Sequence, residues 1–297
     1  MPPEANILDR RGAIAGGFAA AAGLAAGPAR SAGADAAFKA IEARAGGRLG
    51  VSMTRQGDTH VGWREHERFL MCSTFKALAV AAVLARVDHG AEKLDRWIAY
   101  GAQDMQPYAP VTTANLAKGG MTLGDLCAAA VELSDNTAAN LILANLGGPA
   151  AVTRYIRSLG DQITRLDRNE PALNTAKPGT TWDTTTPASM VGLWTRILLE
   201  DALSPASRQR LRDWLAACQT GAARLPAALP ADRHWHIGHK TGSGSTTIGD
   251  IAIIQPSEGR PILIAVYLDA PHAMSVAHDA AIADAGRIAL RRFRNMT

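Results

Sequence analysis

The sequence predicts an α+β fold in which an antiparallel five-stranded sheet is flanked by terminal helices and carries an inserted all-α domain. Apolar and polar residues alternate as in strands near the start, at 50–55 and 60–63, and again near the end, from 234 to 268. The long middle, from about 70 to 220, has helical periodicity instead. Strands at both ends with helices between them indicate that the two ends share one sheet and that the middle is an insertion.

Each element follows from a local pattern. The first two strands flank the turn Gln56-Gly57-Asp58, and a helix at 36–45 precedes them. The other strands are predicted at 234–241, 249–254 and 261–268, and a helix at 275–292 closes the chain. The middle helices are predicted at 70–88, 122–133, 137–146, 149–159, 187–200 and 205–217. These elements divide the chain into an α/β domain, 35–68 with 220–297, and a helical domain, 69–219.

The first 34 residues have the composition of an export signal. Arg10-Arg11 precedes a small and apolar stretch, 12–27, and Ala32-Gly33-Ala34 fits an A-x-A cleavage site. The paired arginines favour the twin-arginine route, although an ordinary secretory signal also fits. Because the apolar stretch is rich in Gly and Ala, we expect no stable membrane anchor. The sequence predicts an exported protein, periplasmic or secreted, that begins near Asp35.

Composition sets limits on partners and cofactors. The formal net charge of +4 is spread along the 297 residues without a basic run, so we expect no nucleic-acid partner. His234 and His236, with His239 nearby, could suggest a metal site, but alternate positions on one strand supply only two convergent ligands. We therefore expect no metal, no cofactor and a monomeric protein.

Ser73-Thr74-Phe75-Lys76 lies within a segment that is otherwise apolar on every side, from Phe69 to Leu84. A lysine is almost never fully buried without a partner, and at i, i+3 it shares a helical face with Ser73. The pair has the pattern of a nucleophile beside its proton acceptor. The alternative is a serine that caps the helix and a lysine that reaches solvent from its first turn.

Three further motifs follow in the chain. Ser134-Asp135-Asn136 lies between two predicted helices, where capping is the alternative role, and Lys240-Thr241-Gly242 lies on a glycine-rich edge strand that could simply end with an exposed lysine. In Glu170-Pro171-Ala172-Leu173-Asn174, Pro171 disfavours a helical conformation at Glu170, which is therefore expected on a loop. A solvated acid on a surface loop is the alternative there.

The trio of Ser-x-x-Lys, Ser-Asp-Asn and Lys-Thr-Gly is the signature of class A β-lactamases and penicillin-binding proteins. With Glu170 and Asn174 added, the chain resembles a class A serine β-lactamase from about residue 35 to its C-terminus. The resemblance implies that Ser134 relays a proton to the β-lactam nitrogen and that Asn136 binds the substrate's side-chain carbonyl. It also implies an ion pair between Arg168 and Asp183 at the neck of the loop.

The resemblance assigns the remaining substrate contacts as well. Lys240 would supply positive charge for the substrate carboxylate, with hydrogen bonds from Thr241 and Ser243. Arg224 resembles an arginine that some members use for the same carboxylate, and Tyr108 resembles the aromatic wall of the cleft. The backbone N–H groups of Ser73 and Ser243 would form the oxyanion hole.

The cysteines can be compared with those of the same family. Relatives that carry a disulfide pair a cysteine corresponding to Cys127 with one at the place of Val80, or one corresponding to Cys72 with one at the place of Gly244. Since neither partner is present, we expect Cys72, Cys127 and Cys218 to be free and mostly buried thiols.

The resemblance implies hydrolysis of the β-lactam amide bond of penicillins and cephalosporins, and with it antibiotic resistance. An acyl-enzyme would form on Ser73 and be deacylated by water activated by Glu170, held jointly with Asn174. Lys76 and Glu170 both remain open as the acylation base. One alternative is a D-Ala-D-Ala peptidase or penicillin-binding protein, which normally lacks the Glu-x-x-x-Asn loop. Another is a non-enzymatic β-lactam sensor, for which the chain offers no spanning helix or extra domain.

Overall fold

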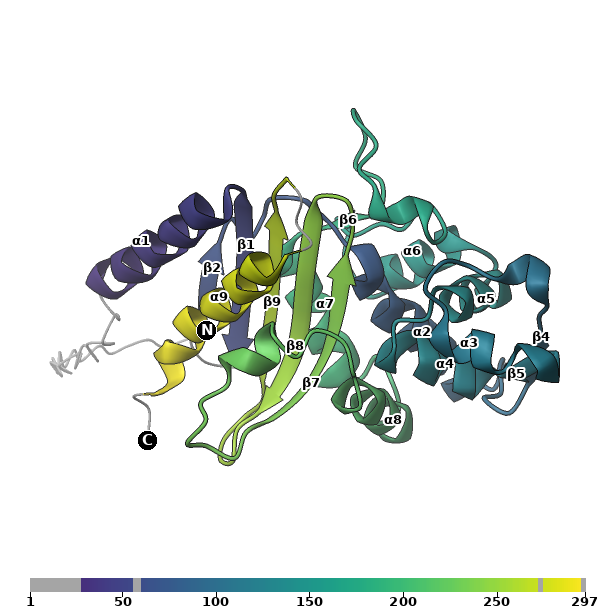
Figure 1. Ribbon diagram of the computed structural model, residues 1–297. Coiled ribbons are helices and arrows are strands. Elements are labelled where there is room, and N and C mark those ends of the chain that lie inside the picture. Colours follow the sequence, from purple (N-terminus) through teal and green to yellow (C-terminus); the bar gives the residue numbers. More distant parts are fainter. Residues whose placement is uncertain (1–27, 56–59, 272–274, 295–297) are drawn as a thin grey trace, which may run out of the picture.

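The computed structural model describes residues 28–55, 60–271 and 275–294, and its centre is a five-stranded antiparallel sheet (Figure 1). The strand order is β2-β1-β9-β8-β7, so the two ends of the chain share one sheet, as predicted. The strands are β1 (Arg48–Arg55), β2 (His60–Trp63), β7 (His236–Ser243), β8 (Thr247–Gln255) and β9 (Ile262–Asp269). Predicted strand ends coincide with these or differ by one or two residues.

Helices cover both faces of the sheet. The terminal helices α1 (Pro28–Ala45) and α9 (Val276–Arg294) pack against each other on one face, and α7 (Pro187–Leu198) packs against β1 and β9 on the other (Figure 1). Alternate residues of β9 serve two cores: Ile264 and Val266 belong to the core beneath α1 and α9, whereas Ala265 and Tyr267 belong to the core of the helical part. This period of two is the consequence of the pleat.

The helical part lies beyond the edge strand β7 (Figure 1). Its helices are α2 (Phe75–Asp88), α3 (Pro110–Ala114), α4 (Leu123–Glu132), α5 (Asn136–Leu146), α6 (Pro149–Ser158) and α8 (Pro205–Ala216). Two short antiparallel pairs join its loops: β3 (Phe69–Leu70) with β6 (Thr184–Thr185), and β4 (Trp97–Ala99) with β5 (Gly120–Thr122). The division into an α/β domain, 35–68 with 220–297, and a helical domain, 69–219, stays a prediction.

The central helix α2 begins later than the sequence predicts. A helix at 70–88 was expected, but β3 and a 3₁₀ turn, Cys72–Thr74, come first and α2 starts at Phe75. Cys72 has a φ of 45°, in the left-handed region, so a regular helix cannot run through it. Ser73 therefore lies in a tight turn at the entrance to α2. The first ten residues of α2, Phe75 to Leu84, are all buried.

The predicted export signal falls largely outside the described residues, because these begin at Pro28. Helix α1 starts there rather than at residue 36 and includes the predicted cleavage site at Ala32-Gly33-Ala34. Among the described helices, none is long and apolar enough to cross a membrane.

Candidate active site

Ser73 and Lys76 meet at one carboxylate. The Ser73 hydroxyl donates to Oε1 of Glu170 over 3.1 Å, and Nζ of Lys76 lies 3.1 Å from the same oxygen. The Lys76 ammonium also donates to the carbonyl of Ser134, over 2.6 Å, and to Oδ1 of Asn136, over 2.7 Å. Lys76 is fully buried, which lowers its pKa, although the Glu170 carboxylate acts in the opposite direction. The solvent-reaching alternative for Lys76 is therefore wrong.

The Ser-Asp-Asn segment combines capping with a place in the site. Asp135 is the N-cap of α5, and its Oδ1 accepts from the N–H of Ala138 over 2.8 Å. Ser134 precedes it with a φ of 59°, a conformation that costs a non-glycine residue free energy and is typical of functional sites. In this conformation Oγ of Ser134 lies between two ammonium groups, 3.3 Å from Nζ of Lys76 and 3.0 Å from Nζ of Lys240.

Lys240 extends from the edge strand β7 toward Ser134 and is fully buried. Its ammonium also donates to the carbonyl of Thr241 over 3.0 Å. Burial, with the positive charge of Lys76 added, lowers the pKa of Lys240 to about 7. The exposed-lysine alternative is therefore wrong.

Two asparagines hydrogen bond to Glu170, and an ion pair closes the loop that carries it. Its backbone N–H donates to Oδ1 of Asn140 and its carbonyl accepts from Nδ2 of Asn140, both over 2.9 Å. Its Oε2 accepts from Nδ2 of Asn174. At the neck of the loop, Nε of Arg168 lies 2.6 Å from Oδ2 of the fully buried Asp183, so the predicted ion pair is present. Glu170 is itself buried, and the solvated-acid alternative is wrong.

A pocket of about 400 Å³ opens above these groups. It is lined by eight residues that the sequence predicted and two that it did not: Ser73, Tyr108, Ser134, Asn136, Asn174, Arg224, Thr241 and Ser243, then Thr220 and Gly221. The three buried charged groups are joined to this lining by hydrogen bonds: Lys76 to Asn136, Lys240 to Ser134 and Glu170 to Ser73. All eleven predicted site residues are thus brought together.

Two of the predicted binding residues, Arg224 and Tyr108, differ in burial. Arg224 is buried, with Nε 2.7 Å from Oδ1 of Asp279 and NH2 donating to Oγ of Ser243 over 2.8 Å. It is therefore fixed in place as a cation beside Ser243. Tyr108 is 59% exposed, has a φ of 58°, and lines the mouth of the pocket. Its carbonyl accepts from the N–H of Asn136 over 3.1 Å, which ties its loop to α5.

Sequence reasoning missed Asn140, Thr220 and Asp279. Asn140 positions the Glu170 backbone, and Thr220 hydrogen bonds through its hydroxyl to Thr241 over 2.6 Å. Asp279, in the first turn of α9, fixes Arg224. A lone Asn within a helix, or an Asp in a first turn, carries no signal of such a role, because both are ordinary surface residues.

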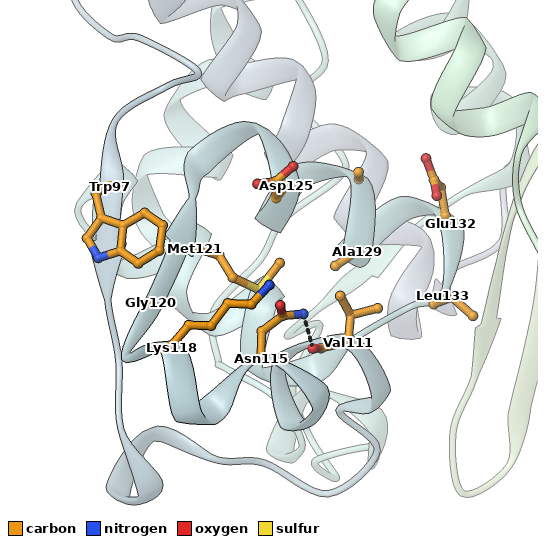
Figure 2. A pocket seen from close by; sticks show the side chains of 11 residues that line it. Trp97, Val111, Asn115, Lys118, Gly120, Met121, Asp125, Ala129, Glu132 and Leu133 are labelled. Atoms are coloured by element: carbon orange, nitrogen blue, oxygen red, sulfur yellow. Dashed lines mark hydrogen bonds between the residues drawn. The ribbon is translucent and has the colours of Figure 1, made fainter.

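A second hollow of about 490 Å³ lies in the helical part, away from Ser73 (Figure 2). Its lining includes the exposed Trp97, Lys118 and Asp125, and one hydrogen bond within it joins Nδ2 of Asn115 to the carbonyl of Val111 over 2.9 Å (Figure 2). Since its lining contains no nucleophile beside a base, we assign the chemistry to the pocket above Ser73. In the part of the chain that the structure describes, no three His, Cys, Asp or Glu side chains gather as metal ligands.

A buried serine, two buried lysines and a carboxylate beneath one pocket define a serine enzyme of the acyl-transfer class. The model of the β-lactamase enzyme family matches residues 33–293. The chain belongs to this family and is a class A β-lactamase, an enzyme that hydrolyses β-lactams.

Solved structures agree with this assignment. The ancestral (GNCA) class A β-lactamase is 53% identical, with 88% of this chain and 100% of that chain covered and a TM-score of 0.83. A mutant of the GNCA enzyme, the last common ancestor of Gram-negative bacteria, is 52% identical, with 89% and 100% covered and a TM-score of 0.85. A β-lactamase from Burkholderia vietnamiensis is 42% identical, with 89% and 97% covered and a TM-score of 0.85.

Proposed function

We propose that this enzyme hydrolyses penicillins and cephalosporins through an acyl-enzyme on Ser73 that Glu170 deacylates, and that it confers resistance to them. The observation that carries the proposal is the position of Glu170. One of its oxygens contacts both Ser73 and Lys76, and the other contacts Asn174. A single carboxylate is thus next to the nucleophile and to the amide that would help to hold a water.

Acylation begins with loss of the Ser73 proton as Oγ attacks the β-lactam carbonyl. Glu170 accepts the Ser73 hydrogen bond, which supports it as one candidate for the base. Lys76 is a second route, because burial lowers its pKa and makes the neutral amine accessible. The proton then reaches the β-lactam nitrogen through Ser134, whose hydroxyl lies between Lys76 and Lys240. Backbone N–H groups of Ser73 and Ser243 would stabilise the oxyanion.

Deacylation needs a water with a base beside it. Oδ1 of Asn174 is buried and has no hydrogen-bond partner among the described residues, while Nδ2 of the same side chain binds Glu170. This amide can therefore accept a hydrogen bond from a water whose proton Glu170 removes. Water attacks the Ser73 ester, the ring-opened product leaves, and Oγ regains its proton. A penicillin-binding protein normally lacks this Glu-x-x-x-Asn loop, which argues against that alternative.

The test is steady-state hydrolysis of a penicillin, a cephalosporin and a carbapenem by residues 35–297, with Ser73→Ala as the control. Turnover of the first two that disappears in Ser73→Ala supports the proposal. A single stoichiometric acylation without turnover would instead identify a penicillin-binding protein or a sensor. Resistance is measured as the growth of a susceptible bacterium that expresses the full chain or its Ser73→Ala variant.

We infer further that the protein is exported to the periplasm or secreted, and acts as a monomer. Arg10-Arg11, the apolar stretch 12–27 and Ala32-Gly33-Ala34 support export. All eleven site residues come from one chain, which supports a monomeric active unit. Light scattering on the mature protein measures the mass: a dimer at working concentration would contradict the monomer.

A further inference from the structure

Three reactive side chains form a cluster that the β-lactam mechanism does not use. His239 lies on β7 next to Lys240, and its Nδ1 is 3.0 Å from Oδ1 of the fully buried Asp250 on β8. The His239 imidazole also hydrogen bonds to the thiol of Cys218, which follows α8. The order thiol, imidazole and carboxylate is the arrangement of an activated nucleophile. The three residues are called the thiol cluster below.

The charges around Cys218 favour its thiolate. Burial acts to lower the pKa of His239, but the contacts with Asp250, together with those to Cys218, hold that pKa above its usual value. Burial alone would raise the pKa of the Cys218 thiol, but the hydrogen bond to His239 and the positive charges of His239 and Lys240 outweigh it and lower the pKa to about 7. Of the charged side chains, His239 and Lys240 have the leading effects on the pKa of Cys218, and Asp250 contacts His239.

The other two cysteines provide an internal comparison. Cys72 and Cys127 are buried, and burial raises the pKa of both thiols. Cys218 is partly exposed. All three are free, so a reagent in solution meets one accessible and activated thiol on the folded protein.

We propose that the thiol cluster is a modification site at which Cys218 exchanges with small disulfides to form a mixed disulfide. The Cys218 thiolate attacks one sulfur of the reagent, a new S–S bond forms, and the S–S bond of the reagent breaks. The released half leaves as a thiolate and takes a proton from water. Cys218 is oxidised by the disulfide, and the released half is the reduced product.

The site is connected to the β-lactam pocket by a short chain of contacts. Sγ of Cys218 is 3.4 Å from Oγ1 of Thr220, which is 2.6 Å from Oγ1 of Thr241 in the pocket lining. The Cys218 thiolate also raises the pKa of Lys240. A mixed disulfide removes that negative charge, so it should weaken the substrate site. This consequence depends on the proposed role of Lys240, whereas the thiol chemistry is independent of β-lactam hydrolysis.

The first experiment uses the wild-type mature protein and 2-hydroxyethyl disulfide, a neutral reagent. Mass spectrometry should find one hydroxyethylthio adduct per folded chain, located on Cys218 by peptide mapping and removed by reductant. The rate should rise with pH with a midpoint near pH 7. No adduct without denaturant, an adduct on another cysteine, or a midpoint at the ordinary thiol value of about 8.5 would overturn the proposal.

Variants separate activation from simple exposure. Cys218→Ser should give no adduct; because it also removes the thiolate charge, its pH profile for a penicillin should resemble that of the modified wild type. His239→Asn should move the midpoint toward about 8.5, while the rate at pH 7 falls only roughly threefold, because a more basic thiolate is also a better nucleophile. His236→Asn, which changes an exposed histidine on the same strand, should leave the midpoint unchanged. Equal midpoints in the wild type and His239→Asn would overturn the role of the imidazole.

The last measurement tests the connection to the pocket. After modification, kcat/KM for a penicillin should fall. The decline of kcat/KM at alkaline pH should also begin at a lower pH than in the unmodified protein. Reductant should restore the value of kcat/KM and the pH profile. Cys218→Ser treated with the reagent should behave as the same variant without treatment. An adduct on Cys218 that leaves the pH profile unchanged would overturn the connection.

Discussion

The hydroxyl of Ser73 donates a hydrogen bond to the carboxylate of Glu170 over 3.1 Å, although the two residues are 97 positions apart in the sequence. The contact requires the tight turn before α2 and the loop at 170 to meet. The Asn140 side chain fixes that loop to α5 through two hydrogen bonds with the Glu170 backbone. The same carboxylate oxygen also contacts Lys76, so the nucleophile and both possible acylation bases form one hydrogen-bonded group.

Replacing Glu170 with Ala should separate the two chemical steps. The carboxylate raises the pKa of Lys76, so its removal leaves more neutral amine to accept the Ser73 proton. Deacylation lacks a substitute base and should slow by a factor of roughly 10²–10⁴. A penicillin should therefore give a burst near one equivalent, then very slow turnover, with intact protein heavier by one ring-opened penicillin.

Two results would change this assignment. Rapid multiple turnover by Glu170→Ala would falsify the role of Glu170 in deacylation. Lost activity without any adduct would make Glu170 the acylation base as well and would leave Lys76 without that role. The double variant with Ser73→Ala should show no adduct in either case.

The ion pair at the neck of the loop should be important for stability. Asp183 is fully buried. In Arg168→Ala the carboxylate of Asp183 would lose its positively charged partner and keep the hydrogen bonds from the backbone N–H groups of residues 167 and 168. We expect a loss of roughly 3 kcal/mol in the free energy of unfolding, at the low end for a buried pair that loses one partner. Deacylation should slow more than acylation, because the loop carries Glu170.

A nearby surface pair is the matched control. Arg165 pairs with Asp167 but its side chain is 38% exposed, so Arg165→Ala should cost less than about 1 kcal/mol. Chemical denaturation of both variants measures the difference. Equal stability of Arg168→Ala and the wild type, with unchanged turnover, would show that the ion pair has no such role in solution.

The three cysteines should all titrate as thiols in denaturant. Cys72, Cys127 and Cys218 are free in the structure, as the sequence predicted. A thiol reagent should therefore count three groups with or without prior reduction. A count that rises by two after reduction would reveal a disulfide.

The sequence predicted the elements well, because strand alternation and helical periodicity are local signals. It did not predict backbone conformations that depend on the finished fold. Cys72, Tyr108 and Ser134 all have a positive φ although none is glycine, and only the surrounding packing can hold them there.

The side-chain partners were missed for a similar reason. On the sheet His239 is paired in register with Ala252, so Asp250 is the diagonal neighbour of His239 on β8. Cys218 contacts His239 from the segment that follows helix α8. Strand register and helix placement bring this cluster together, and neither can be derived from the residue types alone. The motif residues were predictable because their spacing matches a known signature.

Export should remove the N-terminal segment. Because Ala32-Gly33-Ala34 fits the cleavage pattern, N-terminal sequencing of exported protein should start near Asp35. Mature protein that retains Arg10-Arg11, or that starts beyond about Lys39, would contradict this. Replacing Arg10 and Arg11 with Lys should block a twin-arginine route and leave an ordinary secretory route nearly unchanged.

Substrate binding should weaken at alkaline pH because Lys240 loses its charge. Burial and the charge of Lys76 lower the pKa of Lys240 to about 7 in the free enzyme, and a neutral amine attracts a substrate carboxylate less than an ammonium does. Since kcat/KM reports the groups of the free enzyme, kcat/KM for a penicillin should decline as the pH rises above about 7. In Lys240→Arg the guanidinium stays protonated, so the decline should move up by at least about 2 pH units even if the maximum is lower. A decline at the same pH in both proteins would assign it to another group, of which Lys76 is the nearest, since both lysines contact Oγ of Ser134.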